Sequence, residues 1–176
     1  MVSSTALERF SRTAARLGTD VIHTALSSLP DRLGALTDSQ PEWSARVSRE
    51  LVTLIPQLEA LCRGTATWPD LMVGRGRYAV AETGSVVVAE PDHEDRLAAL
   101  LCQHHVVLVP ALTMVEDRLE SAPRLRSLIV GESARYVSFV SGPSRTSDIE
   151  RELTIGAHGP KALTVILVDG WDLDAA

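Results

Sequence analysis

The chain has 176 residues, of which 45% are hydrophobic and 23% charged, and its formal net charge is −6. This length suits one domain with a full core and is short for two, so we predict a single domain over residues 1–176. Sixteen arginines and one lysine, Lys161, are scattered along the chain, which argues against nucleic-acid binding. No apolar run approaches the roughly 20 residues that span a membrane, and residues 1–4 do not resemble the start of a signal peptide. We therefore expect a cytoplasmic protein without membrane insertion.

The cysteines and histidines do not form a metal-binding pattern. Cys62 and Cys102 lie forty residues apart, and neither belongs to a Cys-x-x-Cys pair. We expect two buried thiols and no iron–sulfur cluster or other cofactor in this chain. His104 and His105 are adjacent on an expected strand and point to opposite faces, so they do not chelate one ion together. His93 lies among acidic residues that helix capping explains. No metal site is predicted.

The first part of the chain reads as helix, strand and further helix. Apolar residues spaced by three and four predict a helix that ends before Gly18. A proline at position 56 should kink the long helical segment that contains it. The expected elements are a helix over Ser4–Leu17, a strand over Val21–Thr24, and helices over Ser28–Leu36 and Trp43–Cys62.

The middle of the chain is rich in short strands. Three apolar runs are separated by glycine-containing turns, and Glu82-Thr83-Gly84 reads as a hairpin or tight corner. The expected strands are Leu71–Val73, Tyr78–Ala81, Ser85–Ala89 and His105–Val109, and the expected helices are Pro91–Cys102 and Thr113–Leu119.

The last third alternates strand, helix and strand. We expect strands over Tyr136–Val140 and Leu163–Val168, with a helix over Ser147–Ile155 between them. Ser147 and Glu150 have the spacing of a capping box, which places the helix start at Ser147. The alternation along the whole chain predicts an α/β fold: a mainly parallel sheet with helices on both sides and one antiparallel hairpin.

A polar segment that follows the expected strand Tyr136–Val140 is the first candidate site. Gly142–Thr146 precede the expected helix, where free backbone amides favour an anion. Arg145 adds a planar cation suited to a carboxylate or phosphate. The alternative is a plain helix cap, in which Arg145 pairs with Asp148 or Glu150. The sequence leaves both interpretations open.

Two further residues are candidates for chemistry. Glu82 lies at a corner between two apolar strands, where a carboxylate can act as a base or nucleophile. His158 lies in the glycine-flanked loop Gly156–Pro160 and can reach into a cleft. Each also has an ordinary interpretation, as a solvated turn residue or a histidine bonded to backbone. Because loops after parallel strands share one rim, we expect Glu82 and the Ser141–Thr146 loop to meet.

These motifs together resemble one known family. The segments Ala81–Ser85, Ser141–Glu150 and Gly156–Pro160, with His105 at the start of a strand, resemble the LUD-domain family, and within it the lactate-utilisation protein C group. The resemblance extends from about Leu7 to Val168.

The resemblance implies a fold and a process. The fold is a three-layer α/β/α domain similar to ribose-5-phosphate isomerase, glucosamine-6-phosphate deaminase and coenzyme A transferases. Family members take part in oxidation of L-lactate to pyruvate with iron–sulfur partner proteins, which would carry the clusters. From the residues themselves, rather than from the resemblance, we expect Glu82 and His158 as catalytic residues. The expected residues for binding a small anionic ligand are Thr83, Gly84, Ser141, Gly142, Ser144, Arg145, Thr146 and Asp148.

Other functions stay open. A free-standing enzyme acting on a phosphorylated or acyl-carrying substrate is one, because Glu82-Thr83-Gly84 is similar to the Glu-Asn-Gly nucleophile segment of coenzyme A transferases. A non-catalytic assembly or regulatory subunit is another. The sequence is also compatible with a homo-oligomer.

Overall fold

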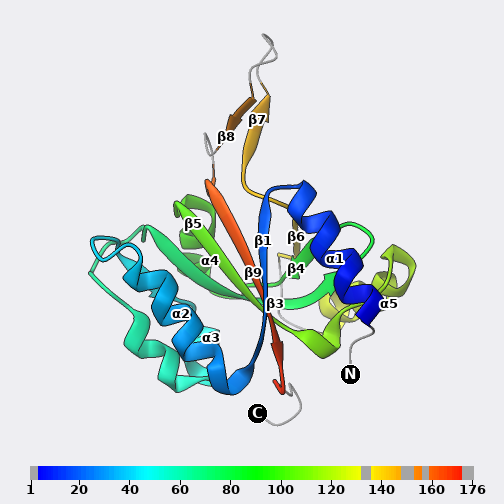
Figure 1. Cartoon of the computed structure of the whole chain (residues 1–176), viewed down its shortest axis with the longest axis horizontal. Helices are drawn as coiled ribbons and strands as arrows, with labels where there is room; N and C mark the ends of the chain where they lie inside the picture. Colours follow the sequence, from blue (N-terminus) through cyan, green and yellow to red (C-terminus); the bar gives the residue numbers. More distant parts are fainter. Residues whose placement is uncertain (1–3, 132–135, 148–152, 156–158, 172–176) are drawn as a thin grey trace.

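The structure is a computed structural model, and it describes residues 4–131, 136–147, 153–155 and 159–171. A seven-stranded mixed sheet forms its centre (Figure 1). Four parallel strands lie side by side in the order β1 (Thr19–Ala25), β9 (Ala162–Asp169), β5 (His104–Pro110) and β3 (Leu71–Val80). The remaining strands are β2 (Ala45–Val47), parallel to the start of β3, then β4 (Ser85–Val88), antiparallel to its end, and β6 (Ser138–Val140) beyond β4. The expected mainly parallel sheet with one antiparallel hairpin is confirmed.

Helices cover both faces of this sheet. Within the described residues the α-helices are α1 (Ser4–Arg16), α2 (Leu29–Asp38), α3 (Arg49–Leu54), α4 (His93–Leu101) and α5 (Arg118–Gly131). Short 3-10 turns occur at η1 (Leu26–Ser28), η2 (Pro56–Leu61) and η3 (Ala111–Thr113).

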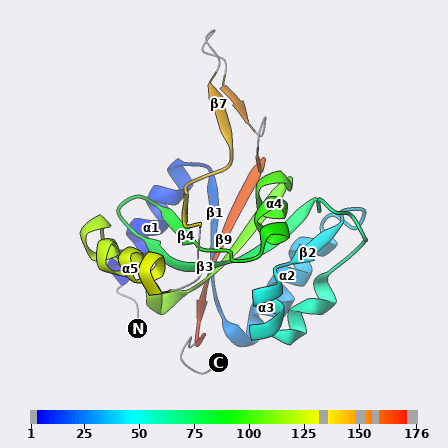
Figure 2. The same cartoon turned by 180° about the vertical axis from the view of Figure 1, so that it is seen from behind.

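Alternation along the strands produces two cores. Val106 and Leu108 of β5 pack in the core that includes α2 and α3. Val107 and Val109, which point the other way, pack in the core that includes α1. On that second face α4 packs on Met72 of β3. Figure 2 shows α4 in front of the sheet in that view. The domain is therefore the three-layer α/β/α arrangement that the sequence predicts.

Two expected elements were wrong in the first half of the chain. The long helix over Trp43–Cys62 is instead β2, α3 and η2, because Ser48 caps α3 by accepting a hydrogen bond from the backbone N–H of Leu51 and Pro56 begins the 3-10 turn. The two strands expected before Glu82 are one strand, β3. Gly76 lies inside this strand and does not form a turn. A larger residue would not fit there, because a Cβ at this position would lie 2.5 Å from a methyl carbon of Val86.

The expected helix over Ser147–Ile155 is also wrong. Arg145–Ser147 form strand β7, and Leu153–Ile155 form β8, which pairs with it antiparallel. Figure 1 shows the two strands as an arm that extends beyond one end of the central sheet. The backbone amides of β7 therefore do not form a helix N-terminus, and the helix-dipole argument for an anion at Gly142–Thr146 does not apply.

No helix within the described residues is long and apolar enough to cross a membrane.

Candidate functional site

The two polar motifs of the last third meet at the base of the β7–β8 arm. The backbone N–H of Ser144, before β7, donates a 2.8 Å hydrogen bond to the carbonyl oxygen of Pro160, after β8. Gly159 packs so closely that a Cβ on it would lie 2.9 Å from the Cβ of Ser144. Segments sixteen positions apart in the sequence are thereby fixed side by side.

The Ser141–Ser144 loop is also attached to the rest of the domain. The hydroxyl oxygens of Ser141 and Ser85, the first residue of β4, lie 2.6 Å apart. Gly142 has a positive φ of 79°, and a Cβ on it would lie 2.6 Å from the carbonyl oxygen of Leu17. Only glycine allows this approach between the loop and the end of α1.

A cavity of about 610 Å³ lies beneath this loop. Its walls come from the end of β4, α4, the starts of β5 and β9, β6 and the two motif segments. Most lining side chains are apolar, and a few polar ones are interspersed. The apolar lining residues are Val88, Leu97, Ala99, Leu100, Tyr136, Phe139, Val140, Pro143, Pro160 and Leu163, and the polar ones are Glu90, His93, Arg96, His105, Ser138, Ser141 and Ser144. Such a composition and volume are typical of small-molecule sites.

Glu90 is a buried carboxyl group in the cavity wall. Burial raises its pKa to about 7, and the nearby charges of Asp95 and Glu50 add to the increase. A hydrogen bond from the Asp92 backbone N–H and the positive charge of Arg77 act in the opposite direction. Glu90 therefore exchanges a proton near neutral pH, which suits a group that donates to or accepts from a ligand.

His105 is a second buried titratable group that lines the cavity. Burial, with a smaller contribution from His104, lowers its pKa to about 4, so the ring is neutral at physiological pH. Its Nε2 atom has no hydrogen-bond partner among the described residues and packs over Gly74, where a Cβ would lie 3.1 Å away. His104 points elsewhere, with its Nε2 atom 2.8 Å from the Thr164 hydroxyl. These contacts agree with the expectation that His104 and His105 point to opposite faces of the sheet.

Arg96 forms another part of the wall, and its guanidinium is already engaged. Nη1 donates to the carbonyl oxygens of Glu90 at 3.1 Å and Pro91 at 2.9 Å. Nη2 lies 3.2 Å from Nδ1 of His93, and Cζ lies 4.6 Å from the centroid of the Tyr136 ring. Arg96 thus holds the backbone before α4 and supports Tyr136 by a cation–π contact.

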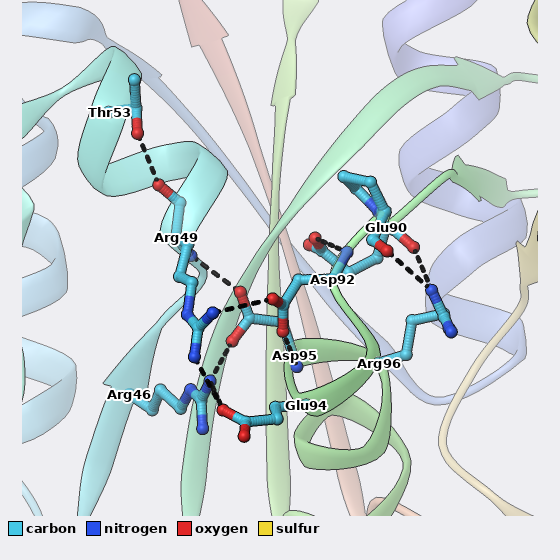
Figure 3. Close-up of polar contacts among 9 residues, drawn as sticks. Arg46, Arg49, Thr53, Glu90, Asp92, Glu94, Asp95 and Arg96 are labelled. Atoms are coloured by element: carbon cyan, nitrogen blue, oxygen red, sulfur yellow. Dashed lines mark hydrogen bonds and ion pairs between the residues drawn. The ribbon is translucent and has the colours of Figure 1, made fainter. Parts of the chain in front are cut away.

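An ion-pair network fixes α4, which carries much of the cavity wall. Figure 3 shows Arg49 at the start of α3 extending toward the acidic first turn of α4. Its guanidinium contacts Asp92 at 3.0 Å and Glu94 at 2.8 Å, and its backbone N–H donates to Asp95 at 2.8 Å. Asp95 is fully buried and also pairs with Arg46 of β2 at 2.6 Å. The position of α4 over the sheet therefore depends on charges from β2 and α3.

The Glu82-Thr83-Gly84 turn joins β3 to β4, as expected, but it lies outside the cavity that the described residues outline. The Glu82 carboxylate accepts from the backbone N–H and Nε of Arg118 at 3.2 and 3.1 Å, and these contacts lower its pKa. Thr83 Oγ1 is buried without a hydrogen-bond partner among the described residues. Gly84 packs on α1, where a Cβ would lie 2.6 Å from the backbone nitrogen of Ala14. This turn supports α1 and the start of α5.

Arg145 lies at the exposed base of the arm. Its Nη2 donates to the carbonyl oxygen of Leu17 at 2.6 Å, and it does not line the cavity as the described residues form it. Thr146 belongs to β7. Asp148 and His158 lie outside the described residues. Of the expected site residues, the cavity brings together Ser141, Gly142 and Ser144.

Glu90, Arg96 and Tyr136 were missed by the sequence analysis. Glu90 had one usable signal: it follows directly on the apolar strand Ser85–Ala89. Arg96 and Tyr136 had none, because only the folded chain brings α4 to the segment before β6. Of the cysteines, Cys102 is buried as expected, whereas Cys62 is exposed, contrary to expectation. Among the described residues, no three His, Cys, Asp or Glu side chains gather as metal ligands.

These features define a three-layer α/β protein with a ligand-sized cavity at the base of a β-arm. The family model for the LUD domain matches residues 33–168, and the chain belongs to this family. The chain is 33% identical over 101 residues to lactate utilization protein C of Shouchella clausii, a match covering 57% of the chain and 44% of that relative. It is 27% identical over 177 residues to lactate utilization protein C of an Exiguobacterium species, covering 92% of the chain and 77% of the relative.

A solved structure shares the fold. The crystal structure of a DUF162 family protein from Deinococcus radiodurans aligns with a TM-score of 0.70 at 18% identity, covering 96% of this chain and 99% of that one. At this identity the likeness concerns the fold.

Proposed function

We propose that the protein serves in lactate utilisation, as a subunit that acts with iron–sulfur partner proteins in oxidising L-lactate to pyruvate. Membership of the LUD-domain family and the names of its relatives support the process. The matched segment covers less than half of the Shouchella relative, so the activity of the whole relative is carried over as part of this proposal. Electrons would pass through the partners, because this chain has no Cys-x-x-Cys pair.

The contribution of this chain, in our proposal, is to bind a small molecule in the cavity beneath the Ser141–Ser144 loop. One observation carries this: residues of the motif by which the chain resembles its family, Ser141, Gly142 and Ser144, line the same cavity as two buried titratable groups, Glu90 and His105. Perturbed proton affinities and a mostly apolar cavity together are typical of functional sites.

Gene deletion with complementation tests the role. We expect the deletion strain to grow normally on glucose and poorly on L-lactate, and the wild-type chain to restore growth. A tagged chain should also co-purify with proteins that carry the visible absorption of iron–sulfur clusters. Normal growth of the deletion strain on L-lactate would contradict the proposal.

A second candidate is a free-standing enzyme acting on a phosphorylated or acyl-carrying substrate. Glu90 favours it, since a carboxyl group with a pKa of about 7 suits general acid–base catalysis. Turnover by the isolated chain, lost in Glu90→Gln, would favour this candidate over the subunit role.

A further inference from the structure

We propose that the cavity beneath the Ser141–Ser144 loop binds an uncharged, flat ring compound with a hydrogen-bonding group at one edge, rather than lactate itself. This inference deepens the proposed function, because it names the ligand class of the cavity assigned there.

The cavity is larger than a three-carbon hydroxy acid needs. At about 610 Å³ the cavity falls within the roughly 300–1,000 Å³ of sites for drug-sized ligands. A three-carbon hydroxy acid would fill a small part of this space and leave most of the apolar wall in contact with water.

Three large apolar side chains that line the cavity are left exposed. Tyr136 is 61% exposed, Phe139 49% and Leu100 59%, and all three line it. A flat ring would cover these surfaces and offer an edge or face to the two aromatic rings. Arg96 supports the Tyr136 ring with its Cζ atom 4.6 Å from the ring centroid.

The charge of Glu90 in the cavity wall disfavours an anionic ligand. Arg96, a cation in the wall, already donates to two carbonyl oxygens, while Glu90 adds a carboxyl group to the same wall. A ligand carboxylate near Glu90 would be repelled whenever Glu90 is ionised. An uncharged hydroxyl or carbonyl group can instead accept from or donate to Glu90 or the neutral ring of His105. Burial keeps both groups desolvated, so a ligand lacking such a group is disfavoured.

Matched probes test the ligand class on the full chain. 2-Naphthol has a ring and an uncharged hydroxyl, 2-naphthoate has the same ring with a carboxylate, and L-lactate has the carboxylate without the ring. By thermal shift and by fluorescence titration at pH 7.5, we expect 2-naphthol to bind about tenfold more tightly than 2-naphthoate, because the charges repel, and L-lactate to give no shift.

Variants locate the binding. Ala99→Phe should fill the cavity and weaken 2-naphthol binding about tenfold or more, whereas Ala35→Phe, at an exposed position of α2, should leave it unchanged. Tyr136→Ala, at an exposed side chain, should weaken binding severalfold and gives a second readout if Ala99→Phe does not fold. Glu90→Gln should reduce the difference in binding affinity between 2-naphthol and 2-naphthoate, because it removes the carboxylate that repels 2-naphthoate.

The outcomes separate this inference from the proposed function. Equal or tighter binding of 2-naphthoate or L-lactate overturns the ligand class, as does absence of 2-naphthol binding or binding that none of the cavity variants affects. If the chain fails these tests yet restores growth on L-lactate, the ligand class is wrong and the role stands. If 2-naphthol binds as expected but deletion leaves growth on L-lactate normal, the role is wrong and the ligand class stands.

Discussion

The backbone N–H of Ser144 donates to the carbonyl oxygen of Pro160 at 2.8 Å, and this bond joins the two ends of the β7–β8 arm. Both residues line the cavity, so the bond that closes the arm also shapes the site. The Ser141–Ser144 loop also lines the cavity, and Gly142 fixes its position by packing closely on the carbonyl oxygen of Leu17 at the end of α1. The cavity therefore depends on close backbone approaches, which substitutions at glycine can test.

We predict that Gly142→Ala destabilises the protein more than Gly170→Ala. Both glycines have a positive φ, 79° and 74°, so each substitution carries about 1 kcal/mol of backbone strain. A Cβ at Gly142 would lie 2.6 Å from the Leu17 carbonyl oxygen, whereas a Cβ at Gly170 meets nothing within 4 Å. We expect a further loss of about 1–3 kcal/mol in the free energy of unfolding for Gly142→Ala. Urea unfolding of both variants measures these losses. Equal losses in the free energy of unfolding would show that the Ser141–Ser144 loop can move away from α1.

The buried ion pair of α4 leads to a second prediction. Asp95 and Glu94 are adjacent and both contact Arg46 and Arg49, but their side chains are 0% and 63% exposed. Asp95→Ala should cost about 3–5 kcal/mol, because it leaves Arg46 without its buried partner and the Arg49 backbone N–H unsatisfied. Glu94→Ala should cost about 0–1 kcal/mol.

Denaturant unfolding of both variants gives the comparison. The matched control is Glu94→Ala, which removes a carboxylate from the same two arginines at the surface. Similar losses in the two variants would mean that the network does not fix α4. A separate thermal-shift measurement of 2-naphthol binding to Asp95→Ala reports whether the cavity wall formed by α4 moves when the Asp95 ion pair is removed.

The sequence predicted the central sheet well and the arm badly, for physical reasons. Strands such as Val106–Val109 are continuous apolar runs covered on both faces, and that pattern is visible locally. Ser147 and Glu150 have a local capping pattern, but Arg145–Ser147 pair with Leu153–Ile155, and this pairing between strands overrides the local preference. Glu90 was missed although it directly follows the apolar strand Ser85–Ala89, because that local signal does not reveal the tertiary packing around the end of β4 that buries it.

His105 should remain neutral well into the acid range. Burial lowers its pKa to about 4, below the ordinary value of 6.5, so the folded protein binds this proton less tightly than the unfolded chain. The stability that the neutral ring contributes is present above about pH 6.5 and is lost as the pH falls toward 4. Proton NMR should show that the Cε1–H shift of His105 is constant from pH 8 to 5.5, with the resonance assigned by its disappearance in His105→Gln. In the urea-denatured chain the same ring should titrate near 6.5. Titration of His105 near 6.5 in the folded protein would mean that water reaches the ring freely.

Glu90 should make the protein less stable as the pH rises through neutrality. Its pKa of about 7 lies above the ordinary 4.5, mainly because the carboxyl group is buried, so the folded state holds this proton more tightly than the unfolded chain. The resulting stability is fully present below about pH 4.5 and is lost as the pH rises through 7. A shift of this size corresponds to about 3 kcal/mol, and water entering the cavity reduces it to about 2 kcal/mol.

The substitution Glu90→Gln removes this titration and isolates its effect. Between pH 5 and pH 8 the free energy of unfolding of the variant, relative to wild type, should rise by about 2 kcal/mol. His105 is present in both proteins, so its own titration cancels in the difference. Glu94→Gln, four positions away on the exposed first turn of α4, serves as the control and should show little change in the same comparison. Urea unfolding at the two pH values measures all three proteins. A difference between Glu90→Gln and wild type that does not change with pH would mean that Glu90 is ionised throughout, and the repulsion of 2-naphthoate should then persist at pH 5.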